Sequence, residues 1–207
     1  MPLADYFDPY ESERLICRWY EFGKDTDFYY NLLKTPSVYL FSDKNFPKPK
    51  TKGEVEEMEK EFRTQVLTVI VCKKPVKADG VQENGKQEEV EPLKPEPIGV
   101  LGIESKVNTQ FHHRSATLGI ELKEDVHNQG YGTEALRWAL KWAFKTANFH
   151  RLQLHVFEWN ERAIVVYKKL GFVEEGRLRE AVWYNGKWWS EMTLGILEDE
   201  WREKYEK

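Results

Sequence analysis

One junction constrains the fold of this chain more than any other feature. The segment HNQGYG, from His127 to Gly132, passes without a linker into TEALRWALKWAF, which has the pattern of an amphipathic helix. An apolar stripe at helical spacing, formed by Leu136, Ala139, Leu140 and Ala143, predicts a helix to about Thr146 or Ala147. A glycine turn directly before a helix leaves free backbone N–H groups beside the positive end of the helix dipole. The junction therefore predicts a binding site for an anion, above all a phosphate.

Alternating apolar residues and β-branched runs predict strands before and after this helix. They are expected at residues 13–21, 65–74, 98–107, 113–122 and 150–158, and as two strands within 173–197. The last two are expected to form a hairpin, because Asn185 and Gly186 are typical of tight hairpin turns. The strands at 98–107 and 113–122 are expected to pair antiparallel, with their turn near residues 108–110.

Helices are predicted at three further places. The first covers residues 27–35, with Asp25 or Asp27 as its cap and Pro36 as its end, and the second covers residues 52–64. The third begins after Asn160 as its N-cap and stops at Gly171. Residues 198–207 are expected to form a charged tail. This order of elements predicts one domain over residues 1–207, with a mixed α/β sheet.

Residues 75–97 differ in composition from the rest of the chain. The segment PVKADGVQENGKQEEVEPLKPEP has almost no large apolar residue and is rich in Lys, Glu, Pro and Gly. Such a segment cannot bury enough apolar surface to fold by itself. We therefore expect a flexible insertion between two adjacent strands.

Composition narrows the class of function. The 31 basic and 35 acidic residues give a net charge of -4, which disfavours nucleic acid and anionic membranes as partners. The N-terminal segment is acidic where a secretory signal is basic, and no apolar stretch reaches membrane-spanning length, so a cytoplasmic protein is expected. Cys17 and Cys72 lie in apolar runs and predict buried, reduced thiols. No residue spacing predicts a metal site.

From Ile98 to Trp201, and more weakly from Glu13, the sequence resembles the GNAT superfamily of N-acetyltransferases. The superfamily's acetyl-CoA motif is Arg or Gln, two residues, Gly, one residue, then Gly or Ala. HNQGYG places Gly130 and Gly132 at the two small positions and His127 at the first. The resemblance implies a mostly antiparallel central sheet flanked by helices, with the pyrophosphate of acetyl-CoA on backbone amides of the turn. A side chain at position 127 would only supplement those amides.

The segment NERAIVVYKKLGF, residues 160–172, is similar to the family's second cofactor segment. There an Asn and a Tyr seven residues later line the acetyl-CoA cleft, and two helical turns place Asn160 and Tyr167 on one face. The resemblance implies that the Tyr167 hydroxyl protonates the thiolate of the departing CoA. The alternatives are a core aromatic at Tyr167 and a simple N-cap at Asn160.

Residues 171–197 resemble the branch that contains ribosomal-protein alanine acetyltransferases and bacterial spermidine/spermine acetyltransferases. The HRSATLGIEL strand is similar to the HRRAE region of the polyamine enzymes, with Thr117 where they have Glu. By family precedent, the backbone of this strand pairs with the pantetheine arm. Together the three blocks imply a cofactor site formed by Ile120, Glu121, Leu122, His127, Asn128, Gln129, Gly130, Tyr131, Gly132, Thr133, Asn160, Ala163, Tyr167 and Lys169.

Acetyl transfer to an amine also needs a general base, because an alkyl amine is mostly protonated at pH 7. The candidates are Glu121, Glu104 on the preceding strand, and the adjacent pair His112 and His113. Glu121 is the first choice. A solvated or surface position is the alternative for each of them.

The resemblance implies an acetyl-CoA-dependent N-acetyltransferase that acylates a primary amine of a small molecule, polyamine-like or other. We expect direct attack in a ternary complex, because neither cysteine lies in the cofactor segments and no covalent intermediate is implied. Two alternatives stay open: a protein N-terminal acetyltransferase of the ribosomal-protein type, acting on a peptide amine, and a non-catalytic CoA-binding module. A homodimer also stays open as an assembly.

Overall fold

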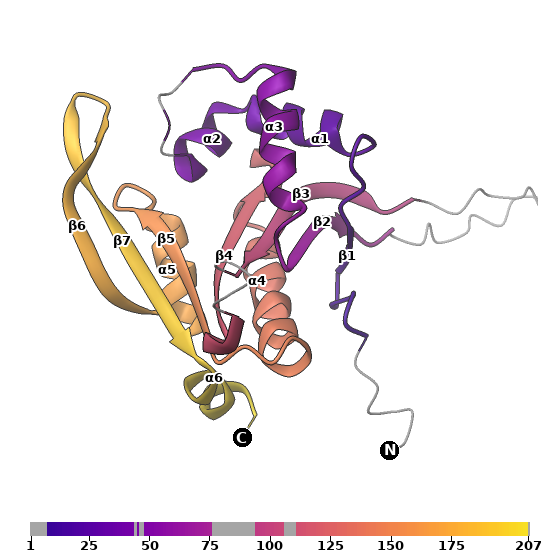
Figure 1. The fold of residues 1–207 in the computed structure, drawn as a ribbon, viewed down its shortest axis with the longest axis vertical. Coiled ribbons are helices and arrows are strands. Elements are labelled where there is room, and N and C mark those ends of the chain that lie inside the picture. Colours follow the sequence, from indigo (N-terminus) through magenta and orange to yellow (C-terminus); the bar gives the residue numbers. More distant parts are fainter. Residues whose placement is uncertain (1–7, 44, 46–47, 76–93, 106–110, 207) are drawn as a thin grey trace, which may run out of the picture.

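The structure is a computed structural model that describes residues 8–43, 45, 48–75, 94–105 and 111–206. These residues form one seven-stranded sheet with helices on both faces (Figure 1). The strands are β1 (Leu15–Trp19), β2 (Leu67–Lys73), β3 (Glu96–Glu104), β4 (Ser115–Leu122), β5 (Arg151–Phe157), β6 (Val173–Tyr184) and β7 (Lys187–Leu197). Their order is β1-β2-β3-β4-β5-β7-β6, with β4 and β5 parallel and the other neighbours antiparallel. The predicted mixed, mostly antiparallel sheet is confirmed.

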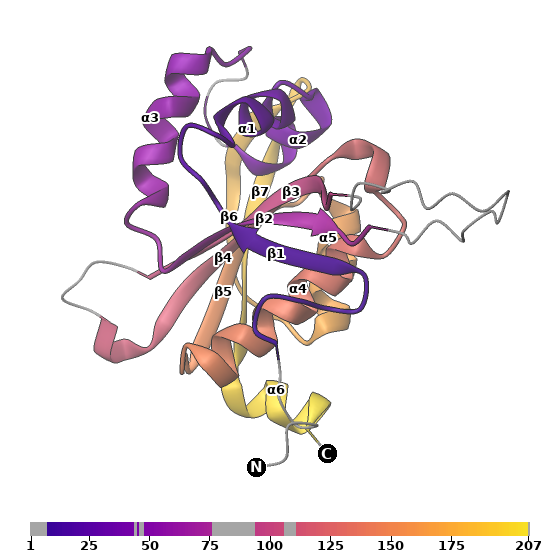
Figure 2. The same ribbon diagram turned by 90° about the vertical axis from the view of Figure 1, so that its right-hand side faces the viewer.

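Helices cover the sheet from both sides. On one face lie α1 (Thr26–Leu33), α2 (Pro36–Ser42) and α3 (Lys52–Phe62), and on the other lie α4 (Tyr131–Lys141) and α5 (Glu161–Leu170), as Figure 2 shows. The chain also makes short 3-10 turns at Phe111–His113 and Glu124–Val126. After α4 a π-helical turn, Trp142–Thr146, continues the helix to the predicted end. The last helix, α6 (Glu198–Tyr205), follows β7 directly.

Two apolar cores lie on the two faces of the sheet. The core under α1 and α3 includes Tyr20, Tyr29, Leu33, Val55, Ile70 and Val100. The core under α4 and α5 includes Leu101, Ala139, Leu140, Leu152, Leu170 and Leu194. Because successive side chains of a strand point to opposite faces, the neighbours Val100 and Leu101 of β3 belong to different cores. This alternation decides on which side of the sheet each polar residue of β3 and β4 emerges.

The parallel pair of strands is short, and this opens the middle of the sheet. Residues 115–117 of β4 pair with residues 151–153 of β5, and no further pairs follow. Beyond that point β4 stays paired with β3 as far as Leu122, whereas β5 stays paired with β7 as far as Phe157. The two strands therefore diverge beyond these three pairs, as Figure 1 shows.

Several local predictions are confirmed. β3 and β4 pair antiparallel, and β6 and β7 form a hairpin in which Asn185 and Gly186 have φ of 48° and 78°. Asn160 caps α5, since its side chain accepts a hydrogen bond from Ala163 N, and Gly171 ends the helix at φ 108°. Cys17 and Cys72 are buried free thiols.

The first helix begins after Asp25, one of the two predicted caps, but this side chain has another role. Asp25 stands at the N-cap position, but its side chain makes no capping hydrogen bond. The carboxylate instead forms a two-point ion pair with Arg18, at 2.6 and 2.7 Å, and accepts from Glu21 N. Asp27 pairs with Lys52 at 2.7 Å. Both carboxylates therefore form ion pairs with basic side chains, and the ion pair of Asp25 connects the start of α1 to β1.

Two helices were not predicted. Pro36 ends α1 as expected, but it is also the first residue of α2, a position that suits proline because its missing N–H is not needed there. The expected charged tail forms α6, where Trp201 is buried and lies 5.5 Å from the Phe144 ring. Trp201 and Tyr205, whose hydroxyl donates to Leu170 O at 3.1 Å, anchor a helix whose other residues are charged.

The expected insertion falls largely outside the described residues, which omit 76–93. The structure places Glu96 and Pro97, the last residues of the expected insertion, in β3. The turn expected near residues 108–110 also lies outside the described part. Among the described helices, none is long and apolar enough to cross a membrane.

Candidate active site

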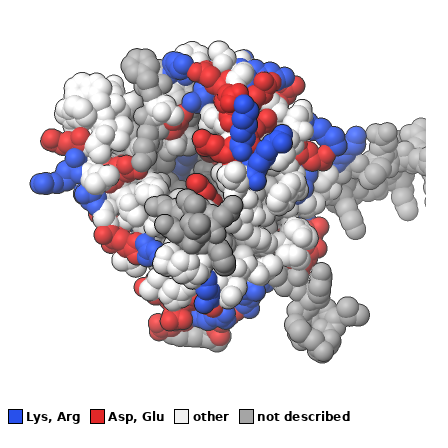
Figure 3. Space-filling view, viewed as in Figure 1, with Lys and Arg blue, Asp and Glu red and all other residues white. Residues whose placement is uncertain are grey.

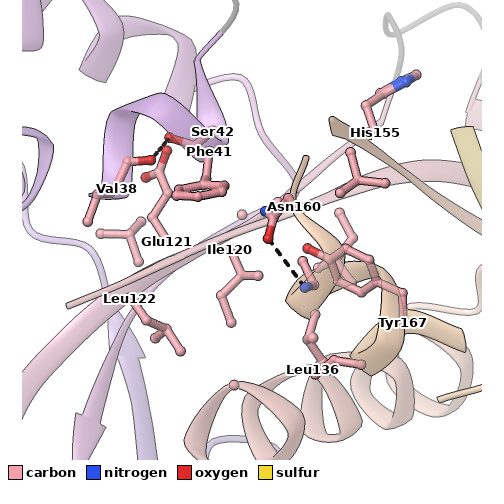
Figure 4. Close-up of a pocket in the computed structure, with 18 of the residues that line it drawn as sticks. Val38, Phe41, Ser42, Ile120, Glu121, Leu122, Leu136, His155, Asn160 and Tyr167 are labelled. Carbon is pink, nitrogen blue, oxygen red and sulfur yellow. Dashed lines mark hydrogen bonds between the residues drawn. The ribbon is translucent and has the colours of Figure 1, made fainter. Parts of the chain in front are cut away.

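A cavity of about 420 Å³ lies where β4 and β5 separate. Its walls come from both faces of the sheet: α1 and α2 on one side, the turn before α4 and the helix α5 on the other. Figure 4 shows how β4 divides it. Ile120 and Leu122 point toward α4, whereas Glu121 points to the opposite face, toward Phe41 and Ser42. A molecule in this cavity can therefore be reached from both faces.

The turn before α4 has the backbone shape expected of an anion site. Asn128 and Gly130 have φ of 61° and 85°, both in the left-handed region. Turns that alternate in this way direct successive N–H groups toward one concavity. Asn128, Gly130, Gly132 and Thr133 line the cavity, and a Cβ atom at Gly132 would stand 3.3 Å from Leu122 Cδ1. The backbone of this turn thus lies against the edge of β4.

Arg14, just before β1, supports this turn from behind, and the sequence did not reveal it. Its guanidinium donates to Glu134 at 2.7 Å and to the Gln129 carbonyl at 3.2 Å, and it stacks over the Tyr131 ring at 4.4 Å. The Gln129 side chain donates to Asp125 O at 2.7 Å. Gln129 and Tyr131 do not line the cavity, so as predicted cofactor contacts they can act only through their backbone.

His127 lines the cavity but is held by the protein itself. Its Nε2 lies 3.2 Å from the carbonyl oxygen of Leu122, at the end of β4. Burial lowers the pKa of His127, and the nearby positive charge of Arg162 lowers it further. The imidazole is therefore neutral at pH 7 and brings no charge to the turn.

The helix α5 brings three of its four predicted residues to the cavity. Asn160, Ala163 and Tyr167 line it, whereas Lys169 is exposed and does not. Burial raises the pKa of Tyr167 to about 12, so its hydroxyl keeps its proton at neutral pH. Within the described part of the chain, none of the hydrogen bonds involves this hydroxyl, and its ring packs edge-on against Phe172. Tyr167 is thus a proton donor at the cavity wall.

Glu121 is the titratable group of the opposite wall. Burial raises the pKa of this carboxyl to about 7, and the charge of Asp43 adds to the shift. Contacts with the Ser42 and Tyr29 hydroxyl groups, and the charge of Lys50, oppose it. At pH 7 the group is therefore close to half ionised and can both accept and return a proton.

The other candidate bases separate into two groups. Glu104 lines the cavity, directly opposite Thr117 in the β3–β4 register. His112 and His113 are exposed and do not line it; their rings contact each other at a tilt of 46°, with centroids 4.0 Å apart.

His155, Glu191 and Arg162 are among the polar residues of the cavity wall that were missed in the sequence. His155 Nδ1 lies 3.3 Å from Thr193 Oγ1 and 3.8 Å from Glu191 Oε1, and Glu191 is only 6% exposed. His155 and Glu191 lie on β5 and β7, and only the strand order brings them beside β4. The sequence signal that could have found them is the alternation of side chains along β5 and β7, which places His155 and Glu191 on the same face of the sheet. In the described residues, no group of His, Cys, Asp and Glu side chains is arranged to hold a metal ion.

Comparison with known proteins identifies relatives of both enzyme types that the sequence resembles. The spermidine N(1)-acetyltransferase of Vibrio cholerae is 29% identical over 107 residues, 52% of this chain and 62% of that protein. The ribosomal protein uS5-alanine N-acetyltransferase of Escherichia coli K12 is 25% identical over 111 residues, 54% of this chain and 56% of that protein. The matched region thus spans less than two thirds of each relative.

Solved structures show the same fold over a larger part of the chain. The crystal structure of spermidine N-acetyltransferase from Vibrio cholerae in complex with CoA and spermine superposes with a TM-score of 0.71 at 24% identity, covering 92% of this chain and 99% of that one. A GNAT-family acetyltransferase from Bacillus anthracis superposes with a TM-score of 0.67 at 20% identity, covering 91% and 98%. The family model of the acetyltransferase (GNAT) domain matches residues 14–173. The chain therefore belongs to the GNAT family of acetyltransferases.

Proposed function

We propose that this protein is an acetyl-CoA-dependent N-acetyltransferase that acylates a primary amine of a small, polyamine-like molecule by direct attack. One observation carries the proposal. The cavity between β4 and β5 has a protonated hydroxyl, Tyr167, on one wall and a carboxyl with a pKa of about 7, Glu121, on the other. These are the acid and the base that acetyl transfer from a thioester to an amine requires.

The cofactor side is the face that carries α4 and α5. The left-handed turn at Asn128 and Gly130 offers amides to a pyrophosphate, and the helix dipole favours its charge. Beyond Thr117, the edge of β4 that faces β5 has no strand partner. Because backbone N–H and C=O groups need partners, the residues Ile120 to Leu122 suit the amides of a pantetheine arm. The CoA in the complex of the Vibrio cholerae enzyme supports this choice of cosubstrate.

The chemistry follows from the two walls. Glu121 takes a proton from the acceptor ammonium, and the freed nitrogen lone pair attacks the thioester carbonyl carbon. As the tetrahedral intermediate collapses, the carbon–sulfur bond breaks and the electron pair leaves on sulfur. A thiol has a pKa of about 8.5, well below that of Tyr167, so the hydroxyl stabilises the leaving sulfur by a hydrogen bond and shares its proton with it. The nitrogen loses its second proton as the intermediate collapses: Tyr167 passes a proton to the sulfur and regains one from the nitrogen, so that the amide and the CoA thiol form. Glu121 then releases its proton to solvent.

The acceptor side is acidic. Glu104, Glu121 and Glu191 line the cavity, and the strand register places all three on the face that carries α1 and α2. Acidic side chains gather around the hollowed centre of the face in Figure 3. Glu104 lies opposite Thr117, so it supplies a carboxylate beside the position where the polyamine enzymes have Glu. Several separated carboxylates favour an acceptor with more than one ammonium group.

The two alternatives are less well supported. A ribosomal-protein type of acceptor would enter as an extended peptide, but the acceptor wall is acidic and lies under α1 and α2. A non-catalytic CoA-binding module has no need for a cavity that contains both Glu121 and Tyr167. A cytoplasmic location and a homodimer stay predictions. One solved relative, the Vibrio cholerae spermidine N-acetyltransferase, is described as dodecameric.

A panel of acceptors tests the proposal. CoA release from acetyl-CoA would be measured with spermidine, spermine, a short diamine, a monoamine and a peptide with an N-terminal alanine. We expect turnover with the polyamines, less with the diamine and little with the monoamine or the peptide. Turnover with the peptide alone would replace the small-molecule acceptor by a protein. A protein that binds acetyl-CoA but acetylates none of these amines would contradict the proposed activity.

A further inference from the structure

The family motif has Arg or Gln at its first position. This chain has a histidine there, whose side chain carries no positive charge at pH 7. His127 stands there, tied to Leu122 O at 3.2 Å, with its pKa lowered by burial. The backbone amides of the turn can hold a phosphate by themselves, but a pyrophosphate carries two negative charges. Among the described residues that line the cavity, no Lys or Arg comes from α4 or the turn before it, and Arg14 is engaged with Glu134 behind the turn.

Arg162 stands on the other side of the same turn. It lies in the first turn of α5, lines the cavity, and is close enough to His127 for its charge to lower the histidine pKa. Within the described residues, none of the hydrogen bonds or ion pairs involves Arg162. By contrast, Arg18, Arg151 and Arg177 each bind a carboxylate.

The placement of Arg162 also breaks a local rule of helix stability. The N-terminus of a helix is its positive end and favours acidic side chains, so an arginine in the first turn is repelled there. Such violations of local preference are typical of functional sites. An anion bound between the starts of α4 and α5 would attract Arg162 and so turn the net electrostatic interaction at this position from repulsive to attractive.

We infer that Arg162 binds the pyrophosphate of acetyl-CoA and supplies the positive charge that position 127 lacks. The two helix starts then hold the anion together: α4 by its backbone amides and α5 by the guanidinium, which can form two parallel hydrogen bonds with phosphate oxygens. This inference rests on the proposed binding of acetyl-CoA. It assigns Arg162 to binding and gives it no part in the proton transfers.

The test compares Arg162→Gln with Lys168→Gln, which removes a cation from the exposed end of the same helix. Calorimetric titration with CoA should show roughly tenfold or greater weakening for Arg162→Gln and little change for Lys168→Gln. Arg162→Lys should lie between them, because it keeps the charge but loses the two-point geometry. The double variant His127→Arg with Arg162→Gln should recover part of the affinity. Equal CoA affinity of wild type and Arg162→Gln, with unchanged thermal melting, would refute the inference.

Cofactor analogues identify the phosphate that Arg162 contacts. Dephospho-CoA lacks the 3′-phosphate but keeps the pyrophosphate, so Arg162→Gln should weaken its binding by the same factor as that of CoA. Acetyl-pantetheine lacks all phosphates, and wild type and variant should use it equally well. Loss of the effect with dephospho-CoA would assign Arg162 to the 3′-phosphate and overturn the pyrophosphate assignment. If wild type binds no CoA at all, the proposed function itself fails, which is a distinct result.

Discussion

The backbone of Gly130 lies against the guanidinium of Arg14, so that a Cβ atom at position 130 would stand 3.2 Å from Arg14 Nη2. Gly130 also has a φ of 85°, which L side chains rarely adopt. The backbone conformation therefore favours glycine here whether or not a ligand is bound, and a side chain would also displace the Arg14 guanidinium by a few tenths of an ångström. The turn is braced by a residue that lies more than a hundred positions earlier in the chain.

Gly130→Ala should weaken acetyl-CoA binding by distorting this braced turn. The left-handed backbone alone should cost roughly 1–2 kcal/mol of unfolding free energy. Gly23→Ala is the matched control, because Gly23 has a φ of 83° but no atom within 4 Å of its Cβ position. Chemical denaturation should show a similar loss for both variants, and calorimetry should show weaker CoA binding for Gly130→Ala alone. Unchanged CoA affinity in folded Gly130→Ala would contradict the turn as phosphate site.

Tyr167→Phe should lower kcat by ~10²- to 10⁴-fold, the usual contribution of a positioned acid, with acetyl-CoA affinity close to wild type. The ring and its packing are preserved, and only the hydroxyl is lost. Tyr205→Phe serves as control. It removes a part-buried hydroxyl that does not line the cavity and donates to Leu170 O at 3.1 Å. Stopped-flow measurement of CoA release would establish that chemistry limits the rate. Wild-type turnover in Tyr167→Phe would leave Tyr167 as a core aromatic.

Activity should depend on the ionisation of Glu121. The carboxylate is the form that accepts a proton, and its pKa is raised to about 7 by burial. The rate kcat/KM should therefore be lost as pH falls below about 7 and should level off above it, until other groups titrate. A pH profile of Glu121→Gln should show a much lower rate without this limb. If Glu121→Gln keeps the wild-type limb, another group is the base, and Glu104 is the next candidate.

Glu104→Gln should raise KM for spermidine by about tenfold, the effect of losing one charged hydrogen bond, and should leave KM for a monoamine unchanged. Glu161→Gln is the control, because Glu161 is an exposed carboxylate on α5 that does not line the cavity. Steady-state kinetics with both acceptors separates the two effects. An equal rise in KM for the monoamine and for spermidine would show that Glu104 does not bind a second ammonium group of the acceptor.

Replacing residues 76–93 by a two-residue turn should change the unfolding free energy by no more than about 1 kcal/mol. Lys73 and Glu96 face each other in the β2–β3 register, so the ends of the two strands already stand side by side. Differential scanning calorimetry and CoA titration would measure the result. A large loss of stability would show that the segment contributes to the core. A changed acceptor preference with intact stability would connect it to substrate selection.

Local chemistry in the sequence was sufficient for much of the fold and for the glycine turn that begins α4. Periodicity, the Asn160 cap, the Gly171 stop and the Asn185-Gly186 turn all act within a few residues, so their outcome does not depend on distant parts of the chain. The glycine turn before α4 is of the same kind. Its backbone shape and the adjoining helix were predictable because φ preferences and helix dipoles are local properties.

Tertiary structure alone decided the acceptor wall and the partners of the turn. Glu104, His155 and Glu191 come together because β5 and β7 follow β4 in the sheet, and β4 and β5 separate after three paired residues. Arg14 contacts the α4 turn from just before β1, and Arg162 lines the same cavity from the start of α5, at distances along the chain that no periodicity encodes. The pKa of Glu121 depends on burial between α1 and α2, and so appears only when the helices are packed on the sheet.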